Sequence, residues 1–172
     1  MPVSRRELLF GAFGLGAAQA KPASNAEEIV RAWMDQWTKL DGSDASAARF
    51  AELYSEDGVH QSGPSVRQIG VVHYEGRSDI QKMAKVFGET FSDVTFRIHP
   101  ATSNEKSVEL VQVAEGPWGG PSAAIEVVSA YNSKKDKKRY MSTGAAVIQI
   151  QGGKIRRSRV YMPREEIMEI SP

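Results

Sequence analysis

The fold prediction starts from residues 53–64, which read LYSEDGVHQSGP. This pattern predicts a helix end that turns tightly at Asp57-Gly58, because glycine tolerates the positive φ that such a turn often needs. A short strand is expected to follow and to stop at the next glycine and proline. Side chains alternate between the two faces of a strand, so His60 and Ser62 should share one face. Gln61 should point to the other face.

His60 is the strongest candidate for chemistry in the chain. If its face lines a pocket, a histidine that titrates near neutral pH could move a proton on or off an acidic carbon. The alternative is that His60 is a satisfied pocket or edge residue, since the sequence identifies no carboxylate that would orient it. Both interpretations stay open from the sequence.

Residues 1–20 have the three-part organisation of an export signal. Adjacent arginines precede an apolar run over 8–18, and the small residues Ala18 and Ala20 have the spacing of a signal-peptidase site. The apolar run is too short to span a membrane, and the paired arginines resemble a twin-arginine signal. We therefore expect a removed leader, and one domain over 21–172 that is periplasmic or secreted. The alternative is a frayed amphipathic helix at the N-terminus.

Charge and cysteine content narrow the class of function. The 172-residue chain has a formal charge of +1, and loss of residues 1–20, with two arginines and one glutamate, would bring it to zero. A neutral domain offers no global attraction for nucleic acid. The chain has no cysteine, which excludes disulfides, thiolate catalysis and cysteine-ligated metals. We expect no cofactor and no membrane span.

Three helices are predicted in the first half of the domain. The first covers about 24–41 and carries Trp33 and Trp37 on its apolar stripe. The second starts near Asp44, and the third has an apolar face over 80–91. Two tryptophans one turn apart could line a ligand pocket, although large aromatics on such a stripe are more often core.

Strands are predicted for the second half of the domain. The apolar segments cover 94–98, 108–113, 123–131, 140–151 and 154–162. Gly152-Gly153 has the composition of a two-residue hairpin turn, and Pro163 is expected to end the last strand before a short tail helix over 164–170. This order predicts an α+β fold, with three helices packed on one face of a strongly curved, mainly antiparallel sheet.

Three short motifs resemble the SnoaL-like branch of the nuclear transport factor two-like superfamily. They are residues 53–59, residues 74–80, and the Gly152-Gly153-Lys154-Ile155 hairpin with Val160-Tyr161 after it. The resemblance implies a cone, in which a bent sheet and its helices enclose a mostly apolar pocket and the outer sheet face often forms a dimer. Members include ketosteroid isomerases, polyketide cyclases, dehydratases, epoxide hydrolases and pocket proteins without a known reaction.

The active-site residues of that family carry over only in part. In the isomerase branch the resemblance implies a carboxylate base on the short strand, and the matching position here is Ser62. SnoaL-like chains often place an acid two residues after the tyrosine that matches Tyr161, whereas Met162-Pro163 follows here. The resemblance therefore implies a fold and a pocket, and it does not imply a cyclase or isomerase activity.

The pocket is expected between the first helix and the sheet. Its candidate ligand-binding residues are Trp33, Trp37, Tyr54, His60 and Ser62; the candidate catalytic residues are His60 as a general base, with Tyr54 and Tyr161 as donors to a developing enolate oxygen. Three functions stay open. The protein could be an exported binder of a small apolar or amphipathic molecule, a cofactor-independent lyase or isomerase (isomerase, cyclase or dehydratase-like), or a homodimeric accessory module with a vestigial pocket.

Two groups outside the pocket have alternative interpretations. His73 and Glu75 share a strand face and could join His60 in a metal site of two histidines and one carboxylate, although the spacing is not specific. Arg157, Arg159 and Tyr161 share one face of the last strand, and Arg156 and Ser158 share the other. Inside the cone such an arginine could hold a carboxylate ligand. On the outer face it would pair with acids or stay solvated, which is favoured because an unpaired buried arginine is costly.

Overall fold

Three helices form one layer of the protein. The computed structural model describes residues 24–63, 72–98, 112–116 and 120–167. The helices are α1 (Ser24–Thr38), α2 (Asp44–Ala51) and α3 (Gly76–Thr90). The start of α2 is capped by Ser43 Oγ, which accepts a hydrogen bond from the backbone N–H of Ser46. The three predicted helices are confirmed.

The second layer is a seven-stranded sheet. Its strands are β1 (Tyr54–Ser62), β2 (Val72–Glu75), β3 (Phe91–Ile98), β4 (Gln112–Gly116), β5 (Gly120–Ser133), β6 (Arg139–Gln151) and β7 (Lys154–Ile167). They run in the order β2-β1-β7-β6-β5-β3, and β4 pairs with β5. The pairs are antiparallel except β1 and β7, which are parallel. The predicted α+β class and mainly antiparallel sheet are confirmed.

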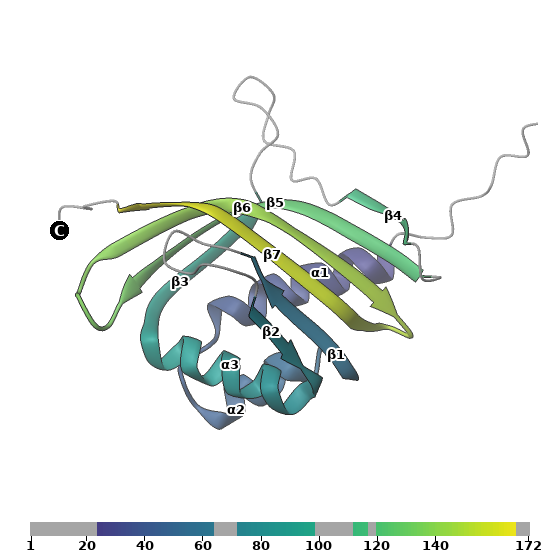
Figure 1. Ribbon diagram of the computed structural model, residues 1–172, viewed down its shortest axis with the longest axis horizontal. Helices are drawn as coiled ribbons and strands as arrows, with labels where there is room; N and C mark the ends of the chain where they lie inside the picture. Colours follow the sequence, from purple (N-terminus) through teal and green to yellow (C-terminus); the bar gives the residue numbers. More distant parts are fainter. Residues whose placement is uncertain (1–23, 64–71, 99–111, 117–119, 168–172) are drawn as a thin grey trace, which may run out of the picture.

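The sheet is strongly curved around the helices. Figure 1 shows β5, β6 and β7 arching over α1, α2 and α3, which lie together on the concave side. Buried residues alternate with more exposed ones along β5 and β6, as expected for a sheet with one face on the core. On α1, Trp33 and Trp37 pack edge to face with ring centroids 5.8 Å apart. The concave side therefore holds the apolar core.

The predicted turn at Asp57-Gly58 is wrong, because both residues lie inside β1. The pairing of β1 with β7 shifts register between Tyr54 and Val59, so the additional residues bulge there. Gly58 is not among the glycines with positive φ. A Cβ atom on Gly58 would lie 2.9 Å from both Tyr54 Cβ and the carbonyl oxygen of Ser55. Glycine is therefore required at this bulge for close packing.

The last two strands confirm one prediction and correct another. The hairpin turn at Gly152-Gly153 is confirmed, and its φ values of +58° and +75° are those that a two-residue turn favours. Pro163 does not end the last strand, because β7 continues to Ile167. Pro163 falls where the β6–β7 register shifts, so the ladder does not need its missing N–H. The predicted tail helix is wrong over 164–167.

Several expectations fall on residues that the structure does not describe. The expected leader over 1–20 and residues 168–170 lie outside the described residues, and the strand expected over 108–113 is described only from Gln112, where β4 begins. Within the described residues, no helix combines the length and the apolar character that a membrane crossing requires.

Candidate functional site

A cavity of about 350 Å³ lies on the concave side of the sheet, next to α3. Met83 and Phe87 line it from α3, Trp37 lines it from α1, and His60 and Ser62 line it from β1. β2, β3, β5, β6 and β7 complete the wall with further aromatic, aliphatic and hydroxyl side chains. The cavity is therefore lined by both helices and strands of the predicted cone.

The cavity wall carries no formal charge. Among the described residues that line it there is no aspartate, glutamate, lysine or arginine. Its polar groups are hydroxyls, one imidazole and one indole, set among apolar side chains. A charged ligand would lose its hydration here without gaining a counter-ion, which costs several kcal/mol at least. The cavity therefore suits a neutral, mainly apolar molecule.

His60 is held by a buried chain of polar groups behind the cavity wall. Trp33 Nε1–H donates to Tyr54 Oη at 2.8 Å, and Tyr54 Oη lies 2.9 Å from Ser158 Oγ. Ser158 Oγ lies 2.8 Å from His60 Nδ1. The parallel pairing of β1 with β7 places His60 opposite Ser158, and both side chains are buried. We call these four residues the polar relay.

Counting hydrogens in the polar relay assigns the tautomer of His60. Tyr54 Oη accepts a hydrogen bond from Trp33 and lies 3.2 Å from His60 Nδ1. The hydroxyl hydrogens of Tyr54 and Ser158 therefore have three possible acceptors, which are the two hydroxyl oxygens and His60 Nδ1. Each of the two hydrogens finds an acceptor only if Nδ1 carries no hydrogen itself. A hydrogen on Nδ1 would leave one buried hydroxyl without an acceptor, at a cost of about 1–3 kcal/mol. His60 is therefore neutral, with its hydrogen on Nε2.

Burial reinforces this neutral state. Loss of water around the ring lowers the pKa of His60 from 6.5 to about 4, because desolvation penalises the charged form. Burial also raises the pKa of Tyr54 far above its usual range, and the hydrogen bonds to Ser158 and Trp33 offset only part of that effect. Since Nδ1 faces the polar relay, Nε2 is the ring nitrogen on the cavity side. At neutral pH His60 presents an N–H donor to the cavity.

Trp37, whose ring lines the cavity close to His60, holds a buried N–H group. Trp37 is 7% exposed, and its Nε1–H has no hydrogen-bond partner among the described residues. The ring centroids of Trp37 and His60 are 5.8 Å apart. A buried N–H without a partner costs about 1–3 kcal/mol, so a ligand oxygen that reached it would recover part of that free energy. The cavity thus combines apolar walls with the imidazole of His60 and several hydroxyl groups.

The structure brings part of the predicted site together. Trp37, His60 and Ser62 line the cavity, and His60 shares its strand face with Ser62 as the alternation predicted. Trp33 and Tyr54 have no exposed surface and lie behind the wall, in the polar relay. Both therefore lie behind the cavity wall, where they take part in the hydrogen bonds that hold His60, and they do not line the cavity.

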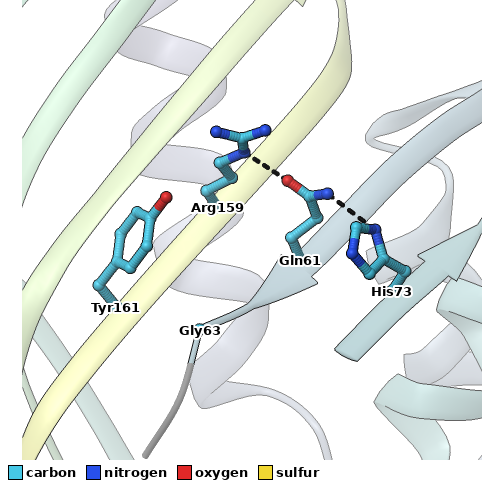
Figure 2. Close-up of a pocket in the computed structure, with 5 residues that line it drawn as sticks. All are labelled: Gln61, Gly63, His73, Arg159 and Tyr161. Carbon is cyan, nitrogen blue, oxygen red and sulfur yellow. Dashed lines mark hydrogen bonds between the residues drawn. The ribbon is translucent and has the colours of Figure 1, made fainter. Parts of the chain in front are cut away.

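Tyr161 lies on the opposite, convex face of the sheet. It is 41% exposed and lines a separate hollow with Gln61, His73 and Arg159 (Figure 2). From there its hydroxyl does not reach the cavity of His60. His73 shares this outer face, so His73 and His60 do not form the two-histidine metal site considered above. The described part of the chain contains no group of three or more histidine or carboxylate side chains placed to hold a metal ion.

Sequence reasoning missed two contributors to the site. Ser158 was expected on the opposite strand face from Arg157 and Arg159, but its contact with His60 depends on a parallel strand pair that local patterns do not reveal. The apolar face of α3 was expected to be core, yet Met83 and Phe87 line the cavity. An apolar helical stripe predicts burial, and it does not distinguish a core contact from a cavity wall.

The SnoaL-like domain family matches residues 30–158. Among curated proteins, none matches the sequence. A hypothetical protein from Catenulispora acidiphila with a ketosteroid isomerase-like fold, in complex with trimethylamine, has a TM-score of 0.58 and 18% identity, covering 79% of this chain and 85% of that one.

Two enzymes of known structure are similar in fold. The epoxide hydrolase/cyclase-like enzyme SalBIII, which has a role in pyran ring formation in the polyether salinomycin, has a TM-score of 0.58 and 15% identity, covering 84% of this chain and 97% of that one. An LEH-like epoxide hydrolase from M. tuberculosis has a TM-score of 0.54 and 13% identity, covering 81% and 83%. At such identities these structures establish the fold alone.

Proposed function

This chain belongs to the SnoaL-like domain family, and we propose that it binds a small, neutral, mainly apolar molecule that carries a hydrogen-bond acceptor such as a carbonyl oxygen. His60 Nε2–H would donate to that oxygen, with Trp37 Nε1–H close by. The cavity volume of about 350 Å³ lies in the lower range of volumes for ligand sites. The molecule would therefore be about as large as a single ring or two fused rings.

The observation that supports this function best is a neutral histidine donor in a cavity without charged side chains. The polar relay leaves Nε2–H as the hydrogen that His60 can offer, because Nδ1 is used by Ser158. A donor in an apolar site discriminates strongly between ligands with and without a matching acceptor, since an unmatched donor stays desolvated and unpaired. Specificity would therefore reside in one oxygen of the ligand.

An enzymatic role in the same cavity is the second candidate. SalBIII and the M. tuberculosis structure carry names of hydrolase or cyclase type. A fixed N–H donor such as His60 Nε2–H can stabilise an oxygen on which negative charge develops. A lyase or isomerase that uses His60 as general base is disfavoured, because the nitrogen on the cavity side already holds a hydrogen. The described residues that line the cavity include no carboxylate that could act as the base in place of His60.

Export and self-association extend the proposal. We propose that residues 1–20 act as a leader and that the protein works in the periplasm or outside the cell. Mass spectrometry of the protein recovered from the cell-envelope and medium fractions tests this, because the mature protein should lack the mass of residues 1–20. From the family resemblance we propose a homodimer through the outer sheet face, formed by β5 and β6 so that the part of this face near β1 and β2 stays open. Of the described residues on that face, Tyr161 is the large apolar side chain that is exposed, so polar contacts would have to hold such a dimer. The mass measured by analytical ultracentrifugation tests whether the dimer forms.

Matched neutral probes test the binding function directly. Acetylnaphthalene and ethylnaphthalene have nearly the same shape and differ by one carbonyl oxygen, whereas naphthoate adds a negative charge. Isothermal titration calorimetry should show the ketone binding about tenfold more tightly than the hydrocarbon, the value of one hydrogen bond. Naphthoate should displace the ketone from the cavity only weakly, because its charge would be buried there without a counter-ion. Equal affinity for all three, or no binding of any, would contradict the proposal.

A cavity-filling variant controls for binding elsewhere on the protein. Ser129 lines the cavity from β5, and Ala124 lies on the exposed face of the same strand. Ser129→Leu should remove ketone binding because its side chain occupies the cavity, whereas Ala124→Leu should leave binding unchanged. If the protein were an accessory module with a vestigial pocket, neither the wild type nor the two variants would bind the ketone in this cavity.

A further inference from the structure

A second polar site lies on the convex face of the sheet, away from the cavity. It is a hollow of about 230 Å³ lined by Gln61, Gly63, His73, Arg159 and Tyr161. Strand pairing sets Arg159 on β7 beside Gln61 on β1, and Gln61 beside His73 on β2. Figure 2 shows these three side chains in a row, with Tyr161 on the other side of Gly63. We call this site the outer hollow.

The amide of Gln61 organises the donors of the outer hollow. Arg159 Nε–H donates to Gln61 Oε1, and because an arginine has no acceptor this contact fixes the orientation of the amide. Gln61 Nε2–H then donates to His73 Nδ1 at 2.8 Å. His73 consequently carries its hydrogen on Nε2. Gln61 is only 6% exposed, so water cannot easily replace either partner.

Arg159 has no carboxylate partner among the described residues. Two other arginines near β1, Arg77 and Arg156, each form an ion pair with a carboxylate of that strand. Arg159 uses Nε for Gln61, and its two terminal nitrogens make no hydrogen bond to any described residue. Glu75 shares the outer face but lies opposite Val59 and does not line the hollow. The hollow therefore presents one unpaired positive charge.

Tyr161 supplies an aromatic wall. A Cβ atom on Gly63 would lie 2.8 Å from Tyr161 Cδ1, so the ring packs directly over the glycine and a larger residue would displace it. Figure 2 shows the hydroxyl of Tyr161 on the side of the ring toward Arg159. A flat ring beside a guanidinium offers both an apolar face and a charge to one ligand.

We propose that the outer hollow binds a small planar carboxylate. The carboxylate would lie against the two terminal nitrogens of Arg159, which form a planar fork that matches it, and the tyrosine ring would cover the apolar part of the ligand. His73 Nε2–H and the Tyr161 hydroxyl add neutral donors at the sides. This site accepts an anion on the convex face, whereas the cavity of His60 accepts a neutral molecule on the concave face.

Benzoate and benzamide test this assignment, because they have the same shape and differ in charge. Each is titrated into the full-length protein and followed by the NMR signals of the Arg159 Nε–H and of the neighbouring backbone amides. We expect benzoate to shift these signals and to bind at least about tenfold more tightly than benzamide. Equal shifts with both probes, or shifts confined to other surfaces, would overturn the proposal. Equal affinity for inorganic phosphate and benzoate would overturn the preference for a planar carboxylate.

Two variants and a matched control locate the site. Gln61→Glu places a carboxylate beside Arg159 with little change of shape, and Arg159→Gln removes the charge; each should weaken benzoate binding by about tenfold or more. Arg157→Gln makes the same charge change two residues away and should leave the affinity within about twofold. Equal losses in the Arg157 and Arg159 variants would indicate non-specific attraction. If Arg159→Gln changed the sedimenting mass and not the benzoate affinity, the hollow would be a contact between copies, and the proposal would be wrong.

Discussion

Ser158 Oγ lies 2.8 Å from His60 Nδ1, although the two residues are 98 positions apart in the chain. The contact exists because β1 and β7 run parallel with these residues directly opposite each other. It determines the chemistry of His60, since an occupied Nδ1 leaves the hydrogen on Nε2. The histidine therefore enters the cavity as a donor.

Removal of single groups from the polar relay should cost different amounts of stability. Tyr54→Phe leaves the buried Trp33 N–H without an acceptor, so the free energy of unfolding should fall by about 1–3 kcal/mol. Ser158→Ala still allows Tyr54 Oη to donate to His60 Nδ1 at 3.2 Å, and should cost about 1 kcal/mol. Urea unfolding measures both. Tyr161→Phe, on the outer face, is the control and should change stability by less than about 0.5 kcal/mol. The reverse order of the two relay variants would contradict the assigned hydrogen positions.

Two substitutions of His60 separate a donor from a base. Glutamine can present an amide N–H near the position of Nε2, whereas leucine cannot donate a hydrogen bond. His60→Gln should retain acetylnaphthalene binding within about fivefold, and His60→Leu should weaken it by about tenfold or more. Ethylnaphthalene, which has no acceptor, should not be weakened by leucine. Loss of ketone binding in the glutamine and leucine variants alike would show that the donor is not the recognised feature.

Acidification should destabilise the protein through His60. In the unfolded chain this histidine gains a proton near its ordinary pKa of 6.5, whereas in the folded protein it does so only near a pKa of about 4. Above pH 6.5 neither state is protonated, so the free energy of unfolding falls as the pH drops from 6.5 toward 4, by about 3 kcal/mol at most. Urea unfolding at a series of pH values measures this loss.

The His60→Gln variant isolates that contribution, because it lacks the titrating group and keeps the carboxylates and other histidines. The stability difference between wild type and variant should shrink or reverse as the pH falls through the same interval. Parallel pH profiles for the two proteins would mean that His60 is not kept neutral by burial.

Gly58 should be sensitive to a single methyl group. Gly58→Ala places a Cβ atom 2.9 Å from Tyr54 Cβ at the bulge of β1, which forces the strand to shift and should cost about 1–3 kcal/mol. Gly152→Asn is the control, since its Cβ would meet open space and asparagine tolerates the positive φ of that turn. Thermal unfolding should show a clear loss for the first variant and little for the second.

Local patterns predicted the elements and the facing of side chains well. The period-two alternation placed His60 and Ser62 on one face of the strand, and the apolar stripe of α1 placed Trp33 and Trp37 on its buried side. These patterns depend only on the geometry of one strand or one helix. They do not report which other strand lies alongside, so the contact between His60 and Ser158 could not be predicted.

The remaining errors have two origins. Asp57-Gly58 has the composition of a turn, but the chain uses the glycine to bring β1 close to the Ile155 region of β7 at a bulge. A proline usually ends a strand, but Pro163 coincides with a shift in the register between β6 and β7, and the strand continues. Tyr161 was grouped with Tyr54 as a donor by residue type, yet strand alternation from Val160 puts it on the convex face. At Asp57-Gly58 and Pro163 a long-range pairing overrides a local preference, whereas the position of Tyr161 follows from local alternation alone.

The tautomer of His60 at neutral pH is the most direct test of the proposed site. Long-range proton–nitrogen correlation NMR on uniformly labelled protein distinguishes a hydrogen on Nε2 from one on Nδ1 and from the charged ring. We predict a single neutral form with the hydrogen on Nε2, persisting well below pH 6.5 because the pKa is lowered to about 4. A hydrogen on Nδ1, or an imidazolium at neutral pH, would contradict the polar relay and the donor role of His60.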